Sequence, residues 1–222
     1  MAQKDLRPRR TPLLQEECAQ LSDIDLLAML FGAGHINTLS QKAASSLLKE
    51  AHGFCDLIDP VFSTVRRTCG ISSTRYTLLK VALELARRYL YASLQRAGPL
   101  ESPATAEAFL RACLRPCRRE TFGCLFLDAR HQVIAYRELF LGTIDSATVH
   151  PREVARAALE CNAAALILAH NHPSGTAEPS SADVAITRRI VDAMHLIDVR
   201  VLDHLVIGSD QVASMAAGGT MP

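Results

Sequence analysis

Two histidines, a serine and an aspartate lie within fourteen positions of one another in the second half of the chain. His170 and His172 follow an apolar run, and Ser180 and Asp183 come after a loop broken by proline and glycine. Residues two apart on extended chain point to the same side, so both imidazoles can reach one ion, with Asn171 turned away. Two imidazoles and a carboxylate suit a catalytic zinc ion, which keeps a fourth position for water.

The same residues also have a simpler interpretation. A His-x-His pair at the end of a strand can be two hydrogen-bonded loop histidines. Ser180 and Asp183 form a Ser-x-x-acid capping box, which is typical of a helix N-terminus without any metal. The spacing alone leaves both interpretations open. If a metal is bound, the absence of cysteine between His170 and Asp183 favours an open catalytic site over a closed structural one.

The elements that position these residues can be read from the hydrophobic pattern. Residues 163–169 are apolar without polar alternation, which predicts a strand buried on both faces. An amphipathic helix follows over residues 182–197. Further strands are predicted at residues 122–128, 133–141, 199–207 and 212–215, and further helices at 104–114 and 151–160. This mixture predicts an α/β fold in which a mixed sheet has flanking helices.

The first half of the chain predicts a small all-α domain over residues 21–97. Ser22 and Asp25 form a capping box before an apolar run that ends at Gly32, and two more helices are expected at residues 39–51 and 74–95. Residues 1–20 are expected to be a flexible basic arm. Residues 98–103 are the expected linker to an α/β domain at residues 101–222.

Length and composition exclude several classes of protein. The 222 residues carry 24 Lys and Arg against 23 Asp and Glu, so the chain as a whole lacks the basic footprint of a nucleic-acid-binding protein. No apolar run approaches the ~20 residues of a membrane helix. Seven scattered cysteines and no secretory signal predict reduced thiols and a cytoplasmic location.

The site residues carry a resemblance to a known family. His170-x-His172-Pro173 followed by Ser180-x-x-Asp183 resembles the JAMM motif of the JAB/MPN family of zinc metallopeptidases. The strings HNHPSG, PSSAD and VLDHLVIG resemble the bacterial RadC-type branch over residues 101–217, with a looser likeness in the helical half. The resemblance implies a JAB/MPN fold, one zinc ion per chain on His170, His172 and Asp183, and hydrolysis of a peptide or isopeptide bond in a protein or peptide-conjugate substrate.

The resemblance also implies catalytic residues outside the ligand set. Amide hydrolysis needs a general acid/base. The family has a glutamate just before the first strand of the domain, and Glu120 matches that place. Glu138 is the nearest rival, and its carboxylate is expected to share a face with Tyr136 and Phe140. The match to the motif makes Ser180 the hydroxyl that stabilises the oxyanion, with its hydrogen pointing outward while its oxygen caps the helix.

Asp203 and His204, in the string VLDHLVIG, are expected to be a satisfied core pair. The alternative role for these two residues is to orient a metal ligand from behind.

RadC-type proteins resemble helix-hairpin-helix proteins in their first half, which implies a phosphate-binding turn at residues 69–73. Ser72 stands where that pattern has a second glycine, so we favour a scaffold or partner module. DNA binding remains an alternative because three basic residues lie near this turn in the sequence: Arg66, Arg67 and Arg75. The alternative function is therefore a non-enzymatic, DNA-associated or DNA-repair-linked module with a structural or vestigial metal site.

Overall fold

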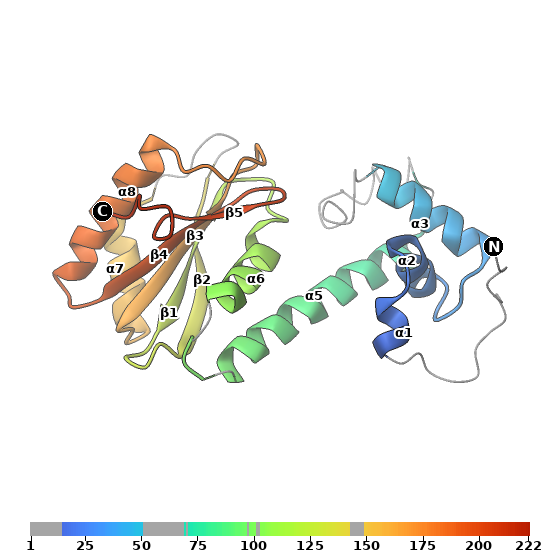
Figure 1. Ribbon diagram of the computed structural model, residues 1–222, viewed down its shortest axis with the longest axis horizontal. Helices are drawn as coiled ribbons and strands as arrows, with labels where there is room; N and C mark the ends of the chain where they lie inside the picture. Colours follow the sequence, from blue (N-terminus) through green and yellow to red (C-terminus); the bar gives the residue numbers. More distant parts are fainter. Residues whose placement is uncertain (1–14, 51–68, 70, 97, 101–102, 143–148) are drawn as a thin grey trace. The chain divides into compact units, whose positions relative to one another are not determined.

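The computed structural model describes residues 15–50, 69, 71–96, 98–100, 103–142 and 149–222 (Figure 1). The chain divides into two compact units, Met1–Ala86 and Arg87–Pro222. The division falls within helix α5 (Ser73–Arg96), upstream of the linker expected at residues 98–103. None of the helices in the described ranges is long and apolar enough to span a membrane.

The first unit is helical over its described residues. It contains α1 (Gln15–Ala19), α2 (Asp23–Phe31), α3 (Thr38–Glu50) and the first part of α5. As predicted, the Ser22 side chain accepts a hydrogen bond from the backbone N–H of Asp25 and caps α2. Helix α1 lies within the stretch expected to be a flexible arm, whose residues 1–14 lie outside the described range. The unit packs around a core of Leu27, Ala28, Phe31, Ala43, Ala44, Leu47, Ile71 and Leu79.

The turn expected to contact a DNA phosphate is described only in part. Ser72 caps α5, because its hydroxyl accepts a hydrogen bond from the backbone N–H of Arg75 at 3.3 Å. The Arg75 guanidinium donates to the carbonyl oxygen of Phe31 at 3.3 Å. Residues 66, 67 and 70 lie outside the described range. A scaffold or partner module remains the prediction for this region, with DNA binding as the alternative.

The second unit contains a five-stranded mixed sheet, as the sequence predicted. Its strands lie in the order β2-β1-β3-β4-β5, where β3 and β4 are parallel and the other neighbours are antiparallel. An Asp128 carboxylate oxygen accepts from the backbone N–H groups of Arg130 and Gln132, which forms the predicted turn between β1 and β2. The strands are β1 (Thr121–Leu127), β2 (Val133–Leu141), β3 (Ala165–Asn171), β4 (Arg200–Ile207) and β5 (Val212–Ser214).

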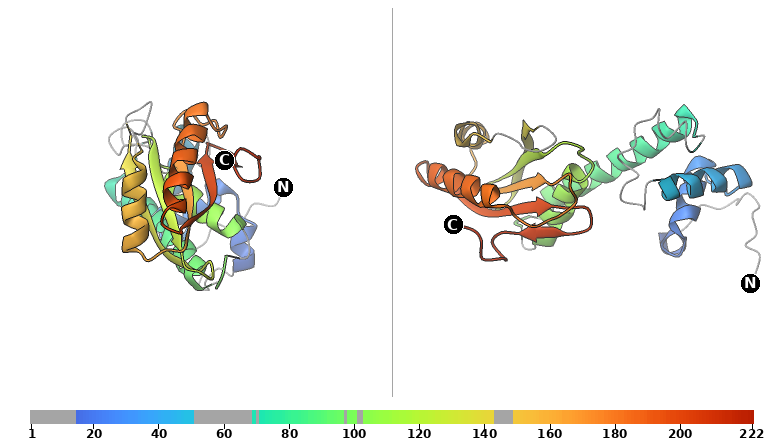
Figure 2. Two further views of the ribbon diagram at one scale, coloured as in Figure 1. Left: turned by 90° about the vertical axis from the view of Figure 1, so that its left-hand side faces the viewer. Right: turned by 90° about the horizontal axis from the view of Figure 1, so that it is seen from above.

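Helices cover both faces of this sheet (Figures 1 and 2). Helix α6 (Pro103–Leu114) packs on one face with Leu125, Leu127 and Ala169. Helices α7 (Pro151–Glu160) and α8 (Ser181–His195) pack on the other face with Phe122 and Leu168. Because side chains alternate along a strand, the buried apolar strand residues divide between two separate cores.

Strand β3 begins and ends two residues later than the sequence predicted. Its backbone pairs with β1 and β4 continue through His170, which pairs with Phe122 and Val206, to Asn171, which pairs with Ile207. The apolar run predicted a strand at residues 163–169, but backbone pairing from both sides carries the strand into its polar end. His170 therefore lies inside the sheet, on the face covered by α7 and α8.

Candidate metal centre

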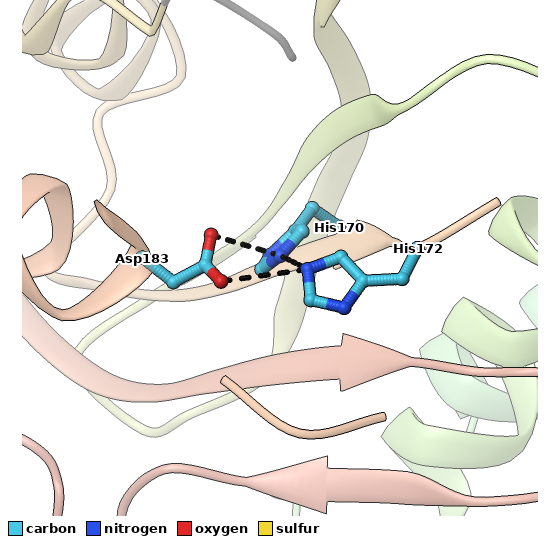
Figure 3. A group of neighbouring side chains, drawn as sticks. All are labelled: His170, His172 and Asp183. Atoms are coloured by element: carbon cyan, nitrogen blue, oxygen red, sulfur yellow. Dashed lines mark hydrogen bonds and ion pairs between the residues drawn. The ribbon is translucent and has the colours of Figure 1, made fainter. Parts of the chain in front are cut away.

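The connection between β3 and β4 brings the aspartate to the histidines. Parallel strands require a crossover, and α8 supplies it. A crossover helix starts near the carboxyl end of the strand that precedes it, and ligand sites gather there in α/β sheets. Asp183 lies in the first turn of α8, where it faces His170 and His172 (Figure 3).

The three side chains converge on one point. His170 Nε2 lies 3.0 Å from His172 Nε2 and 3.1 Å from Asp183 Oδ1, and His172 Nε2 lies 3.4 Å from Asp183 Oδ2. Tetrahedral zinc bonds of 2.0–2.1 Å place their ligand atoms roughly 3.3 Å apart. The observed separations lie near this value, with each histidine next to a different Asp183 oxygen, so the three residues could hold a metal ion. The His170 and Asp183 side chains are 1% and 11% exposed, whereas His172 is 18% exposed.

His172 is held in the tautomer that a metal requires. Its Nδ1 lies 2.8 Å from the carbonyl oxygen of Thr176. A carbonyl only accepts, so Nδ1 carries the hydrogen and Nε2 of the neutral ring has a free lone pair. That lone pair points to the other two ligands.

Asp183 is held as a carboxylate by its capping box. Its Oδ2 accepts from the Ser180 backbone N–H at 2.7 Å and from the Ser180 hydroxyl at 2.6 Å. Burial alone would raise the pKa of the Asp183 carboxyl, but hydrogen bonds with His170, His172 and Ser180 lower it well below its usual range. The Ser180 hydrogen was expected to point outward. In the structure it is donated to Asp183, because the carboxylate is the nearest strong acceptor.

His204 lies behind His170 and is fully buried. Its ring contacts His170 Nδ1 at 2.8 Å and the Thr187 hydroxyl at 2.6 Å. Burial lowers the pKa of His204 well below its usual value, so this ring is neutral. The expected side-chain pair of Asp203 with His204 is wrong, since Asp203 accepts instead from the His204 backbone N–H and from the Ser214 hydroxyl.

Glu138 lies on the face of the sheet opposite His170, whereas Glu120 lies just before β1. Glu138 pairs with Gly123, which pairs with Ala169, so its side chain belongs to the face covered by α6, opposite His170. Glu120 is half-buried, two residues before Phe122, whose backbone pairs with His170. The pKa of His172 is raised chiefly by its hydrogen bond with Asp183, and the charge of Glu120 adds to this rise.

The expectation that Tyr136 and Phe140 share one face with Glu138 is wrong. The pairing of β1 with β2 shifts register between Phe122 and Gly123, so that Phe140 pairs with Phe122 but Glu138 pairs with Gly123. This bulge at Leu139 puts Phe140 into the core on the α7 and α8 face, whereas Tyr136 packs with the α6 core. Glu138 shares the face of Tyr136 only.

Sequence reasoning missed two residues that support the site. Asn171 is buried and accepts a hydrogen bond from the backbone N–H of Thr121 at 2.8 Å. Its amide donates to the carbonyl oxygens of Cys117 and Arg119. Thr187 is the second, and its position one helical turn after Asp183 was a usable signal, because residues four apart share a helix face. For Asn171 no local pattern signals the contact.

Comparison with known proteins agrees with this architecture. Residues 100–220 match the family model described as RadC-like JAB domain. The chain is 49% identical to the UPF0758 protein of Thioalkalivibrio sulfidiphilus, over 98% of this chain and 96% of that protein. It is 47% identical to the UPF0758 protein of Alcanivorax borkumensis, over 98% of this chain and 97% of that protein. With the sheet, the helices and the His-His-Asp group in place, the chain belongs to the RadC family of proteins with a JAB domain.

Proposed function

We propose that this protein is a zinc-dependent hydrolase that cleaves a peptide or isopeptide bond in a protein or peptide-conjugate substrate. The observation that carries the proposal is the close approach of His170 Nε2, His172 Nε2 and the Asp183 carboxylate, in which each histidine lies 3.1 or 3.4 Å from one of the two carboxylate oxygens. Zinc in such a site lowers the pKa of a bound water to about 7 and polarises a substrate carbonyl.

The residues around the ligands supply the remaining groups for amide hydrolysis. Glu120 is the general acid/base, which takes a proton from the attacking water and passes it to the departing amine. Its place two residues before Phe122, whose backbone pairs with His170, and the effect of its charge on the pKa of His172 support this role. Ser180 is the hydroxyl that stabilises negative charge on the substrate oxygen, once its hydrogen turns from Asp183 to that oxygen.

Metal analysis of the purified full-length protein tests the site. We expect about one zinc ion per chain, and loss of that zinc in the His172→Ala, Asp183→Ala double variant. Arg156→Ala is a matched control, since Arg156 lies on the exposed surface of α7 and pairs with Glu153. If the double variant keeps its zinc, the metal does not bind at the site proposed here.

A panel of substrates tests the reaction. Zinc-loaded protein should cleave isopeptide-linked conjugates or linear peptides, and a chelator should stop the cleavage. Zinc binding without cleavage of any substrate in the panel would instead support the DNA-associated module with a structural metal.

A further inference from the structure

Three short contacts join the ligand His170 to the backbone of the ligand Asp183 through two other residues. His170 Nδ1 lies 2.8 Å from His204 Nε2, and His204 Nδ1 lies 2.6 Å from Thr187 Oγ1. Thr187 Oγ1 lies 2.5 Å from the Asp183 carbonyl oxygen. Both His204 and Thr187 are fully buried, so bulk water does not compete for these contacts.

The number of hydrogens fixes the direction of this chain of contacts. A neutral imidazole carries one N–H, a hydroxyl carries one O–H, and a carbonyl oxygen only accepts. Each of the three contacts contains a hydrogen in one arrangement only. In it the Thr187 hydroxyl donates to the Asp183 carbonyl oxygen, His204 Nδ1–H donates to the Thr187 oxygen, and His170 Nδ1–H donates to His204 Nε2. In the reverse direction two oxygens would face each other at 2.5 Å with no hydrogen between them.

The direction of the contacts decides which nitrogen of His170 can bind a metal. With the hydrogen on Nδ1, the Nε2 lone pair is free, and this is the atom that faces His172 and Asp183. The reverse direction would put the hydrogen on Nε2 and block coordination. A histidine ligand is commonly fixed in this way by a hydrogen bond to its other nitrogen, and loss of that partner costs roughly 10–100-fold in metal affinity.

We propose that His204 and Thr187 are positioning residues, which hold His170 in the tautomer and ring orientation that binds the metal. The last acceptor in this series of hydrogen bonds is the Asp183 carbonyl oxygen. The series therefore connects the end of β3 to the start of α8. The proposal rests on the metal site of the proposed function. It gives the histidine of the string VLDHLVIG a role that its burial in the core does not require.

The tautomers of the metal-free, full-length wild-type protein provide the first test. Histidine selectively labelled with ¹⁵N gives ring nitrogen shifts that separate Nδ1–H from Nε2–H. We expect Nδ1–H for both His170 and His204. A His170 ring without a hydrogen on Nδ1 would overturn the proposal whether or not the protein binds zinc. The tautomer of His170 tests the positioning proposal. The zinc content of the purified protein tests the proposed function, so the two can fail separately.

Two pairs of variants provide the second test. Thr187→Val removes the hydroxyl at nearly constant shape, and Thr187→Ser keeps it. His204→Leu removes the acceptor for His170, and His204→Gln places an amide oxygen near the position of Nε2. Competition with a chromophoric chelator should show zinc affinity roughly 10–100-fold weaker for the Val and Leu variants. The Ser and Gln variants should recover most of it.

Thermal unfolding of the metal-free variants separates positioning from stability. Variants with lower unfolding temperatures but unchanged zinc affinity and an unchanged His170 tautomer would overturn the proposal, because that is the behaviour of a purely structural core pair. If Thr187→Val or His204→Leu does not fold, the wild-type spectrum and the conservative variants still decide the question.

Discussion

The Asn171 side-chain oxygen accepts a hydrogen bond from the backbone N–H of Thr121 at 2.8 Å, across 50 positions of sequence. Asn171 lies between the two candidate histidine ligands in the sequence. Its side chain instead makes hydrogen bonds to the backbone of the segment that leads into β1. Glu120 belongs to that segment. The residue between the ligands therefore fixes the backbone of the proposed acid/base, and this relationship suggests a first variant.

Asn171→Leu should lower the rate of amide hydrolysis by roughly 10-fold or more while zinc content stays near one per chain. The reason is that the Thr121 N–H and the Cys117 carbonyl oxygen lose the partner that Asn171 provides, at a cost of about 1–3 kcal/mol for each buried group left unpaired. Zinc analysis, rate and unfolding temperature should be measured together. Loss of zinc in this variant would mean that Asn171 acts on the ligands and not on Glu120.

Glu120→Gln should keep zinc bound and lower amide hydrolysis by roughly 10²–10⁴-fold, as expected for loss of a positioned acid/base. Glu138→Gln is the matched control, since Glu138 is exposed on the other face of the sheet. Its rate should remain within a few-fold of wild type. If Glu138→Gln lowers the rate and Glu120→Gln does not, Glu120 is not the general acid/base.

Ser180→Ala should lower both the stability of the protein and the rate of hydrolysis. Ser22→Ala is the control, because it removes a serine cap from a helix outside the site. The Ser22 hydroxyl makes the same two contacts at the start of α2, since it donates to the Asp25 carboxylate and accepts from the Asp25 N–H. Each cap should contribute about 0.5–2 kcal/mol to the free energy of unfolding. Only Ser180→Ala should also slow hydrolysis, and equal rates in the two variants would exclude a catalytic hydroxyl at Ser180.

The stability of the metal-free protein should fall as pH rises past neutrality. The hydrogen bond with Asp183 raises the pKa of His172 in the folded state. A raised pKa favours folding fully below the unfolded value of about 6.5 and loses this contribution as pH rises through the folded value. Zinc replaces that proton, so stabilisation by zinc should grow over the same window. Unfolding temperatures of chelator-treated and zinc-loaded protein check both signs.

Asp183→Asn is the control for this pH dependence, because it removes the carboxylate that raises the pKa of His172. The fall in metal-free stability above about pH 6.5 should become shallower in this variant. An unchanged slope would assign the pH dependence to other groups.

Binding of the full chain to duplex and branched DNA at physiological salt should be no tighter than the non-specific range of ~10⁻⁴–10⁻⁶ M. The chain is near neutral, and Ser72, where a phosphate-binding turn would have glycine, serves as a helix cap. Filter binding or fluorescence anisotropy at several salt concentrations measures this. Tight binding with a steep salt dependence would restore the DNA-associated alternative.

The amino-acid sequence by itself determined which residues are the candidate ligands and most of the elements. His170 lies in β3 and His172 follows it two positions later, just beyond the end of the strand, while Ser180 and Asp183 begin a helix. Both patterns depend only on strand alternation and local capping geometry. The mixed sheet follows from the order of apolar strands and amphipathic helices. These features need no knowledge of which strands pair.

Only the tertiary structure decided the surroundings of the ligands. The bulge at Leu139 places Glu138 opposite His170, and alternation along β2 alone would have left it beside Phe140. Asn171 reaches Thr121 across 50 positions, and His204 reaches His170 across 34. Such contacts depend on strand order and register, which are set by how two cores pack against one sheet, and no local pattern of residues encodes them.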